Sequence, residues 1–434
     1  MVFSTFHGII KIEKAKGGSE MKKILGLGLG ACLVLGLVAC GTEKEIETEE
    51  DNQNIVFYHT LRESTMETLV SAIEQFEEAN PGWTVEDVNL GVYDEVYKKV
   101  LEDKDSGQTP DLVYCLPEHV ASYKEKSLIT SLDSFINDED LGYTADERNI
   151  FVKAFYVEGK SYGDDMLYSL PFLKQTEVIY TEQDLYPATW EAVPQFAQSK
   201  EAPYVLGTDS TANLFLTMSA QLQSDFTSAT GEHILFDNAE NREFVQMLKT
   251  WHDAGIYTNP MNSYLSVSSV DYLIGSTTGA VNQNRGQNIK VAPIPTFYGK
   301  ELKVPFQGPS LCMIQKSKAK MEKTWTFMKD FLLTAEAQAG FSMETGFNPV
   351  LKSTYDVPEY QAWLLTGDGS SYSQGIVPLV ALVCSAYVDY YYFPDPFEKL
   401  ATAKTEVGKL IDNVLSGVKS LDQAFLDAVA NCKK

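Results

Sequence analysis

The chain is organised around the stretch Tyr168-Ser-Leu-Pro-Phe-Leu-Lys-Gln-Thr-Glu-Val-Ile-Tyr180. It consists of two short apolar runs, Tyr168–Phe172 and Glu177–Tyr180, separated by the polar patch Lys174-Gln-Thr176. A strand that breaks for a few polar residues and then resumes is typical of a segment that crosses between two compact bodies. By itself, the pattern fits an ordinary surface loop between two strands of one sheet better. The rest of the chain therefore has to decide between the two interpretations.

The size and charge of the chain narrow the possibilities. A chain of 434 residues is too long for one ordinary hydrophobic core, so two lobes or domains are expected. The formal net charge of −25 argues against a nucleic-acid partner, which requires a basic surface, and favours uncharged or cationic ligands. Little capacity exists for clamping a phosphate with paired hydrogen bonds, because the arginines are only Arg62, Arg148, Arg242 and Arg285.

Residues 21–39 resemble the signal peptide of a bacterial lipoprotein. Lys22 and Lys23 form a positively charged start, and Ile24–Val38 is an apolar core. Leu37-Val-Ala-Cys40 then resembles a lipobox, whose cysteine receives acyl chains such as palmitate and becomes the new N-terminus. A membrane-spanning helix is the alternative, but the apolar run is short for one and no positive stop signal follows it. Cys40 is thus the expected lipidation site.

The segments on either side of this signal fit the same interpretation. Residues 1–20 match no targeting pattern, and we expect translation to start at Met21. Removal of residues 1–39 takes away five lysines and two glutamates, so the net charge becomes −28. Residues 40–53 are rich in glutamate and are predicted to form a disordered tether. The expected location is the outer face of the cytoplasmic membrane of a bacterium.

Strands and helices alternate after the tether. Strands are predicted at Asn54–His59, Thr84–Leu90 and Thr109–Tyr114, with helices starting at the capping box Ser64-Thr-Met-Glu67 and at Asp94. This order indicates an α/β fold with a parallel sheet between helices. Ligands of such sheets bind at the carboxyl ends of the strands, where His59, Tyr93 and Glu118 are expected.

A series of loose motifs becomes specific through its order and spacing. The motifs are Ile55–Thr60, Phe76–Gly82, Ser106–Val113, Ser131–Ile136, Tyr168–Tyr180, Pro187–Glu191, Phe244–Pro260, Leu273–Ala280, Val291–Pro295, Thr324–Phe331, Thr345–Val350 and Val414–Ala428. Together they resemble the family 1 extracellular solute-binding proteins of ABC importers, of the maltose and glycerol-3-phosphate type. The resemblance covers residues 54–430 and implies a two-lobed, type II periplasmic-binding-protein-like fold, with a hinge of crossing segments and a ligand cleft between the lobes.

This resemblance carries further expectations. The first lobe is expected to contain residues 54–171 and 304–345, and the second lobe residues 172–303 and 346–434. The opening stretch is then the first crossing segment rather than a surface loop. The resemblance also implies a monomeric lipoprotein that captures a small solute and delivers it to an ABC permease in the membrane.

The sequence offers little support for catalysis. His59, His119, His233 and His252 stand singly, and neither H-E-x-x-H nor G-x-S-x-G occurs. We therefore expect no enzyme activity, no metal and no cofactor. Carboxylate pairs such as Asp164-Asp165 leave a secreted glycoside-active enzyme as a remote alternative. A surface adhesin or scaffold is a further rival, although it does not require two interleaved lobes.

A sugar ring asks for aromatic faces beside carboxylates and amides. The expected ligand contacts are His59, Tyr93, Glu118, Gln175, Asn284, Arg285, Gly308 and Phe347. Tyr93, Glu118 and Gly308 match ligand-touching positions of the glycerol-3-phosphate branch, whose phosphate-binding arginine falls near Pro396 here. A sugar or oligosaccharide is therefore favoured. Glycerol 3-phosphate or a glycerophosphodiester stays as the alternative, because Arg285 is suited to hold a phosphate.

Four cysteines remain after processing. Cys115 and Cys312 lie in apolar, strand-like runs and are predicted to be buried thiols. The spacing of these two residues, Cys384 and Cys432 neither assigns nor excludes a disulfide. Tyr180 and Trp325 are assigned to the core.

Overall fold

The computed structural model describes residues 52–63, 66–259, 269–278, 288–368 and 375–433. All of them belong to one compact unit. The predicted signal peptide, the lipidation site Cys40, most of the tether, Ser64 of the capping box, and the contacts Asn284 and Arg285 lie outside the described residues. No helix of the described ranges is long and apolar enough to cross a membrane.

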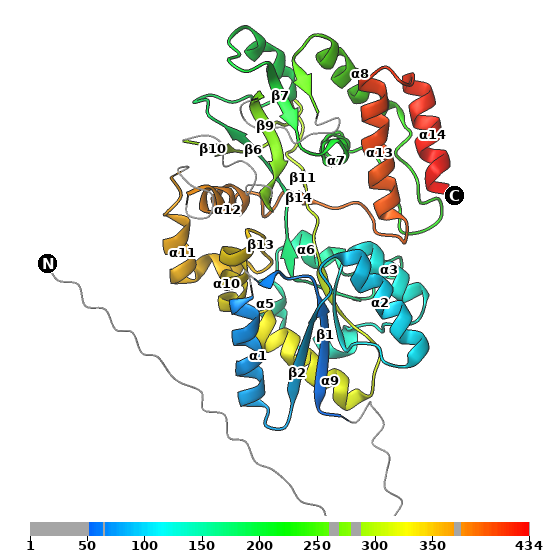
Figure 1. Ribbon diagram of the computed structural model, residues 1–434, viewed down its shortest axis with the longest axis vertical. Helices are drawn as coiled ribbons and strands as arrows, with labels where there is room; N and C mark the ends of the chain where they lie inside the picture. Colours follow the sequence, from blue (N-terminus) through cyan, green and yellow to red (C-terminus); the bar gives the residue numbers. More distant parts are fainter. Residues whose placement is uncertain (1–51, 64–65, 260–268, 279–287, 369–374, 434) are drawn as a thin grey trace, which may run out of the picture. The chain divides into compact units, whose positions relative to one another are not determined.

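The first sheet has the strand order β2-β1-β3-β12-β4 (Figure 1). Its strands are β1 (Asn54–His59), β2 (Thr84–Asn89), β3 (Leu112–Cys115), β4 (Leu170–Pro171) and β12 (Ser310–Met313). Strand β1 pairs in parallel with both β2 and β3, as the alternation of elements predicts, whereas β12 runs antiparallel to β3. A distant segment of the chain thus completes the sheet.

Successive side chains of β1 point to opposite faces of the sheet. Because apolar residues occur at both sets of positions, both faces have to be covered, and helices cover them. Ile55 and Phe57 pack with α1 (Glu67–Ala79) and α9 (Lys318–Phe327). Tyr58 packs on the other face with α2 (Tyr93–Ser106) and α3 (Pro117–Glu125).

Helix α1 differs from its prediction at two places. It begins at Glu67, and Met66 stands at its N-cap without a side-chain hydrogen bond. The hydrophobic pattern from Met66 to Phe76 also predicts Val70 on the apolar face, but Val70 is 47% exposed. The buried residues of the helix are Leu69, Ala72 and Phe76. Each residue is rotated by 100° from the one before it, so Val70 lies away from the face that these residues form.

The second sheet has the order β10-β6-β9-β7-β8. Its strands are β6 (Glu177–Thr181), β7 (Tyr204–Thr208), β8 (Tyr257–Thr258), β9 (Val270–Ser276) and β10 (Lys290–Ala292). The helices α7 (Thr211–Gln221), α8 (Ala239–Asp253), α13 (Leu400–Leu415) and α14 (Leu421–Lys433) pack together beside this sheet (Figure 1). Ser420 caps helix α14, with the Gln423 amide donating to Ser420 Oγ at 3.3 Å.

The opening stretch runs from one sheet to the other, which confirms its interpretation as a crossing segment. It leaves the first sheet at β4, forms the short β5 (Leu173–Lys174) and enters the second sheet at β6. A second segment returns through β11 (Val304–Pro305) to β12. Gln175 and Gln307 join the two crossings through reciprocal backbone hydrogen bonds of 2.8 and 3.0 Å. The exact residue limits assigned to the two lobes stay a prediction.

A third segment pairs with the first crossing. Strand β13 (Asn348–Pro349) follows α10 (Ala335–Thr345) and runs antiparallel to β5. Strand β14 (Tyr391–Tyr392) pairs in parallel with β11. The chain therefore gathers several short strand pairs where it passes between the sheets.

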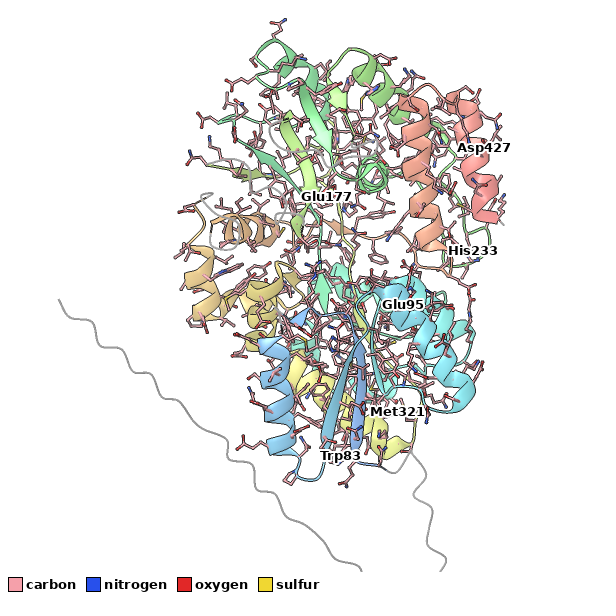
Figure 2. All side chains as sticks on the ribbon, viewed as in Figure 1. Trp83, Glu95, Glu177, His233, Met321 and Asp427 are labelled. Atoms are coloured by element: carbon pink, nitrogen blue, oxygen red, sulfur yellow. The ribbon has the colours of Figure 1, made fainter. Side chains whose placement is uncertain are left out.

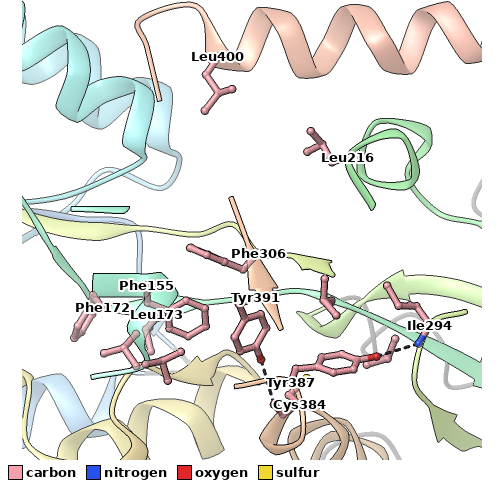
Figure 3. Packing of buried hydrophobic residues seen from close by; sticks show 14 of the residues in the cluster. Phe155, Phe172, Leu173, Leu216, Ile294, Phe306, Cys384, Tyr387, Tyr391 and Leu400 are labelled. Carbon is pink, nitrogen blue, oxygen red and sulfur yellow. Dashed lines mark hydrogen bonds between the residues drawn. The ribbon is translucent and has the colours of Figure 1, made fainter. Parts of the chain in front are cut away.

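Aromatic side chains fill the space around these pairs, as Figure 3 shows. The ring centroid of Phe155 lies 4.5 Å from that of Phe306 and 4.6 Å from that of Tyr391. The Tyr391 hydroxyl donates to the Cys384 carbonyl at 3.3 Å, and the hydroxyl of Tyr387 accepts from the Ile294 amide at 3.0 Å. Each buried hydroxyl of this pair thus has a backbone partner.

The predicted core residues are buried. Tyr180 and Trp325 are fully enclosed, and all of the four cysteines after Cys40 are buried free thiols. Cys115 on β3 and Cys312 on β12 face the same helices, and their Sγ atoms are 3.3 Å apart.

Candidate ligand-binding site

A cavity of about 200 Å³ lies where the crossing segments meet the two sheets. Helices from both sides contribute to it. Its lining consists of Tyr93, Leu116, Pro117, Glu118, Glu158, Gln175, Phe306, Gln307, Gly308, Pro394, Leu400 and Lys404. A smaller neighbouring cavity of about 10 Å³, large enough for about one water molecule, shares Phe306, Gln307 and Lys404 with it.

Two lining residues follow strands of the first sheet. Tyr93 begins α2 just beyond β2, after Gly91, whose φ of +79° suits glycine. Glu118 lies in the first turn of α3, just beyond β3. Both strands end at the same edge because they are parallel, so this edge carries a phenol and a carboxylate together.

Glu118 lines the cavity with a carboxylate whose hydrogen bonds are not all satisfied. The residue is 6% exposed, and its Oε2 atom has no hydrogen-bond partner among the described residues. A buried carboxylate oxygen without a partner is costly. The N-terminus of α3 stabilises the negative charge in part, and the residue's place in the cavity lining makes it a candidate acceptor for a ligand hydroxyl.

A second carboxylate, Glu158 at the end of α6 (Lys153–Glu158), is already neutralised. It forms a buried ion pair with Lys174. Lys174 Nζ also donates to the Gly308 carbonyl at 3.0 Å and to Ser310 Oγ at 3.1 Å. Burial lowers the pKa of Lys174 and raises the pKa of Glu158, while the attraction between the two charges opposes both shifts. Lys174 therefore ties the two crossing segments together.

Gln175 is held on both its backbone and its side chain. Its Oε1 atom accepts hydrogen bonds from Ser276 Oγ at 2.9 Å and from Thr278 Oγ1. Its backbone is bonded to Gln307. An amide fixed in this way is preorganised for a ligand, because little side-chain freedom remains to be lost on binding.

Lys404 is the residue that sequence reasoning missed most clearly. It is half-buried on α13 and lines both cavities. No hydrogen bond or ion pair of Lys404 is found within the described part of the chain, although its positive charge opposes the rise in the pKa of Glu158 that burial causes. A signal was available: Lys404 lies four residues after Leu400 and four before Gly408, both buried, so it falls on the inward face of an amphipathic helix.

An acidic pair lies beside the smaller cavity, at the start of the second sheet. Glu177 opens β6 (Figure 2) and is 1% exposed, with one carboxylate oxygen accepting from Asn213 Nδ2 at 2.6 Å. Asp209 accepts from the Ser276 amide at 3.0 Å. Burial raises the pKa of Asp209 to about 6, and burial together with the nearby Asp209 charge raises the pKa of Glu177 well above its usual range.

The cavity brings together half of the expected contacts. Tyr93, Glu118, Gln175 and Gly308 line it. Asn284 and Arg285 lie outside the described residues. Among the described residues of the chain, no group of three or more His, Cys, Asp or Glu side chains is placed to hold a metal ion.

His59 and Phe347 lie elsewhere. The His59 ring is fully buried against Phe57, its Nδ1 accepts from the Leu61 amide at 3.1 Å, and its Nε2 is 3.5 Å from the carboxylate of Asp87. Burial lowers the pKa of His59. Phe347 packs against the core, and its carbonyl accepts from Ser342 Oγ at 2.7 Å. Neither side chain lines the cavity.

Residues 71–366 match a family of proteins described as bacterial extracellular solute-binding protein. The chain belongs to this family. This solute-binding protein is 23% identical over 340 residues to the maltotriose-binding protein of Pyrococcus abyssi, over 72% of this chain and 70% of the relative. Its family consists of proteins that bind solutes, so the expectation of a binding protein rather than an enzyme is confirmed.

Solved structures show the fold of this solute-binding protein. The sugar-binding protein MalE of Xanthomonas citri superposes with a TM-score of 0.72 at 14% identity, covering 88% of this chain and 96% of the other. UgpB of Mycobacterium tuberculosis, solved with glycerophosphocholine, superposes with a TM-score of 0.68 at 15% identity, covering 88% and 97%. The two-lobed α/β fold is therefore confirmed.

Proposed function

We propose that this solute-binding protein captures a small carbohydrate in the cavity and delivers it to an ABC permease. The observation that carries the proposal is the buried Glu118 carboxylate, which lines the cavity together with Tyr93 and two glutamine residues and has one oxygen without a partner among the described residues. A carboxylate and amides suit the hydroxyl rim of a sugar, and an aromatic ring suits its apolar face. The maltotriose-binding relative and the sugar-binding structural neighbour support the same class of ligand.

The arrangement of the lining supports capture by closure. Glu118 lies on α3, which packs against the first sheet. Leu400 and Lys404 lie on α13, which packs beside the second sheet. A ligand touches both sides at once only when the two sides approach. Binding then shifts the equilibrium between open and closed forms toward the closed one, which the permease would recognise.

Attachment to the membrane is part of the proposal. Cleavage before Cys40 and acylation of this cysteine would leave an acidic tether before β1. Two or three acyl chains hold a protein stably at a bilayer, whereas a single chain holds it only marginally. The protein would then act as a monomer on the outer face of the cytoplasmic membrane.

A glycerophosphodiester is the second candidate ligand. The observation that favours it is Lys404, a cation that lines the cavity without a partner among the described residues. The structural neighbour solved with glycerophosphocholine supports this candidate. Lysine binds phosphate as a point charge and without the paired geometry of arginine.

A thermal-shift screen over sugars, polyols and glycerophosphodiesters tests the proposal. A ligand at about 100 times its Kd adds about 2.7 kcal/mol to the free energy of unfolding, which is enough to raise Tm measurably. We expect a sugar to raise Tm, and Glu118→Gln to weaken that rise while Glu125→Gln, an exposed change on the same helix, leaves it intact. Stabilisation by phosphodiesters alone would overturn the carbohydrate assignment.

A further inference from the structure

The cavity contains two charges of opposite sign, those of Glu118 and Lys404, for which no hydrogen-bonded or ion-paired partner is found among the described residues. Glu118 lies on α3 and Lys404 on α13, so the two charges face the cavity from opposite sides. The other charged side chain of the lining, Glu158, is compensated by Lys174. The charges of these four residues therefore cancel, but two of them lack a hydrogen-bonded partner.

The Glu118 carboxylate and the Lys404 ammonium require different hydrogen-bonding partners. A carboxylate is an acceptor only, and an ammonium is a donor only. Glu118 therefore needs a donor on the ligand, and Lys404 needs an acceptor. A ligand hydroxyl satisfies either group, but a ligand with a net negative charge would leave a negative charge uncompensated in the cavity beside Glu118.

No other lysine near the cavity is available for this role within the described chain. Lys174 already donates to Glu158, Gly308 and Ser310. Lys399 and Lys409 are equally near in sequence: Lys399 is exposed, Lys409 pairs with Glu406, and neither lines this cavity. Near the N-terminal end of α13, Lys404 also gains nothing from the helix dipole, which favours cations at the other end.

We propose that Lys404 is a specificity-determining ligand contact that acts with Glu118 from the opposite side of the cavity. The pair selects a solute that is neutral overall and orients it, with a donor toward α3 and an acceptor toward α13. The inference rests on the proposed function and deepens it, because it restricts the ligand to neutral carbohydrates. It thereby decides against sugar acids and against the second candidate wherever the phosphodiester carries a net negative charge, since Glu118 would repel it.

The test uses the full-length protein and isothermal titration calorimetry. The probes are the neutral sugar that stabilises the wild type best in the thermal-shift screen and the matching uronic acid. Lys404→Met should weaken binding of the neutral sugar by about 10- to 100-fold, which is the loss expected for one hydrogen bond to a charged group. Lys404→Arg should retain most of the affinity. The matched control Lys399→Met, which alters an exposed lysine outside this cavity, should change affinity by less than about twofold.

The charge preference is tested separately. The wild type should bind the neutral sugar more tightly than its uronic acid. Lys404→Glu should lower the affinity for the uronic acid further, because two carboxylates then face it. Circular dichroism and the Tm of each unliganded variant establish that it is folded.

The possible failures are distinct. Equal affinity of the wild type and Lys404→Met for the sugar overturns the inference and leaves the proposed function standing. A wild type that prefers the uronic acid or a phosphate ester overturns the selection for neutral solutes. A wild type that no sugar stabilises contradicts the proposed function and the inference with it.

Discussion

Lys126 at the end of α3 and Glu398 just before α13 form an ion pair, with 3.1 Å between Nζ and Oε1. Lys126 Nζ also donates to Ser122 Oγ at 2.6 Å. The same two elements carry Glu118 and Lys404 farther along. The pair therefore links the two elements that carry these cavity residues.

We predict that Lys126→Met weakens ligand binding by favouring the open form. The pair is partly exposed, so its contribution is 0.2–1 kcal/mol and the loss of affinity is up to about 5-fold. Lys98→Met, which breaks the exposed Lys98–Glu95 pair inside α2, is the control. The Kd of each variant at low and high salt checks this, because salt should shrink the difference between Lys126→Met and the wild type. An undiminished affinity at low salt would refute the role.

The buried Glu158–Lys174 pair is predicted to stabilise the crossing segments. Lys174→Met leaves the Glu158 carboxylate buried without its cation, which costs about 3–5 kcal/mol of the free energy of unfolding. The double variant Glu158→Gln, Lys174→Met should recover part of this loss. Urea denaturation measures it, and Lys290→Met, which breaks an exposed pair with Asp184, should cost less than about 1 kcal/mol. Equal losses for the two lysine variants would show that burial is unimportant here.

The acidic pair predicts a pH dependence of stability. The pKa of Asp209 is raised to about 6 in the folded protein, so its contribution is present below its ordinary pKa and is lost as the pH rises through about 6. Glu177, which lies nearby with a raised pKa, acts in the same direction. Asp209→Asn should therefore gain stability relative to the wild type between about pH 4 and pH 7. Chemical denaturation across this range checks it, and parallel curves for the two proteins would contradict it.

Gly308 is predicted to tolerate no side chain. Its φ is +129°, and a Cβ atom there would lie 2.5 Å from the Leu173 carbonyl oxygen on the neighbouring crossing segment. Gly308→Ala should lower Tm and distort the cavity, whereas Gly299→Ala, with φ of +73° and open space around it, should cost only about 1 kcal/mol. Thermal unfolding of both variants gives the comparison. Similar Tm values would mean that the two crossings separate at little cost.

The mature protein is predicted to begin at Cys40 with acyl chains attached. Mass spectrometry of the N-terminal peptide from native membranes should show the lipid mass, and Cys40→Ala should release the protein into the medium or leave the signal peptide uncleaved. An unmodified N-terminus upstream of Cys40 would be incompatible with this prediction.

The sequence predicted those parts of the site that follow from a local rule. Tyr93 and Glu118 lie beyond the ends of parallel strands, where any ligand of such a sheet binds. The rule fails for His59, which shares the face of β1 with Phe57 and so points into the core. The alternation of side chains along the strand decides between core and cavity.

The remaining part of the site depends on distant pairings. Glu158 and Lys404 reach the cavity only because α6 and α13 are placed against the crossing segments by the rest of the fold. Lys174 lies in the polar patch of the crossing segment, next to the expected contact Gln175, yet Glu158 and Gly308 occupy its donors. The hydrophobic periodicity of a single segment carries no information about such contacts between distant residues.

The reciprocal backbone hydrogen bonds between Gln175 and Gln307 join the two crossing segments into one part of the cavity lining, which we call its floor. In the proposed closure, the helices that carry Glu118 and Lys404 approach each other and move apart, while this floor does not move. A solute can then settle on the floor while these helices are apart, at a rate set by diffusion. The dissociation rate of the solute is set by how slowly α3 and α13 separate again. Changes at the Lys126–Glu398 pair should therefore alter the dissociation rate far more than the association rate.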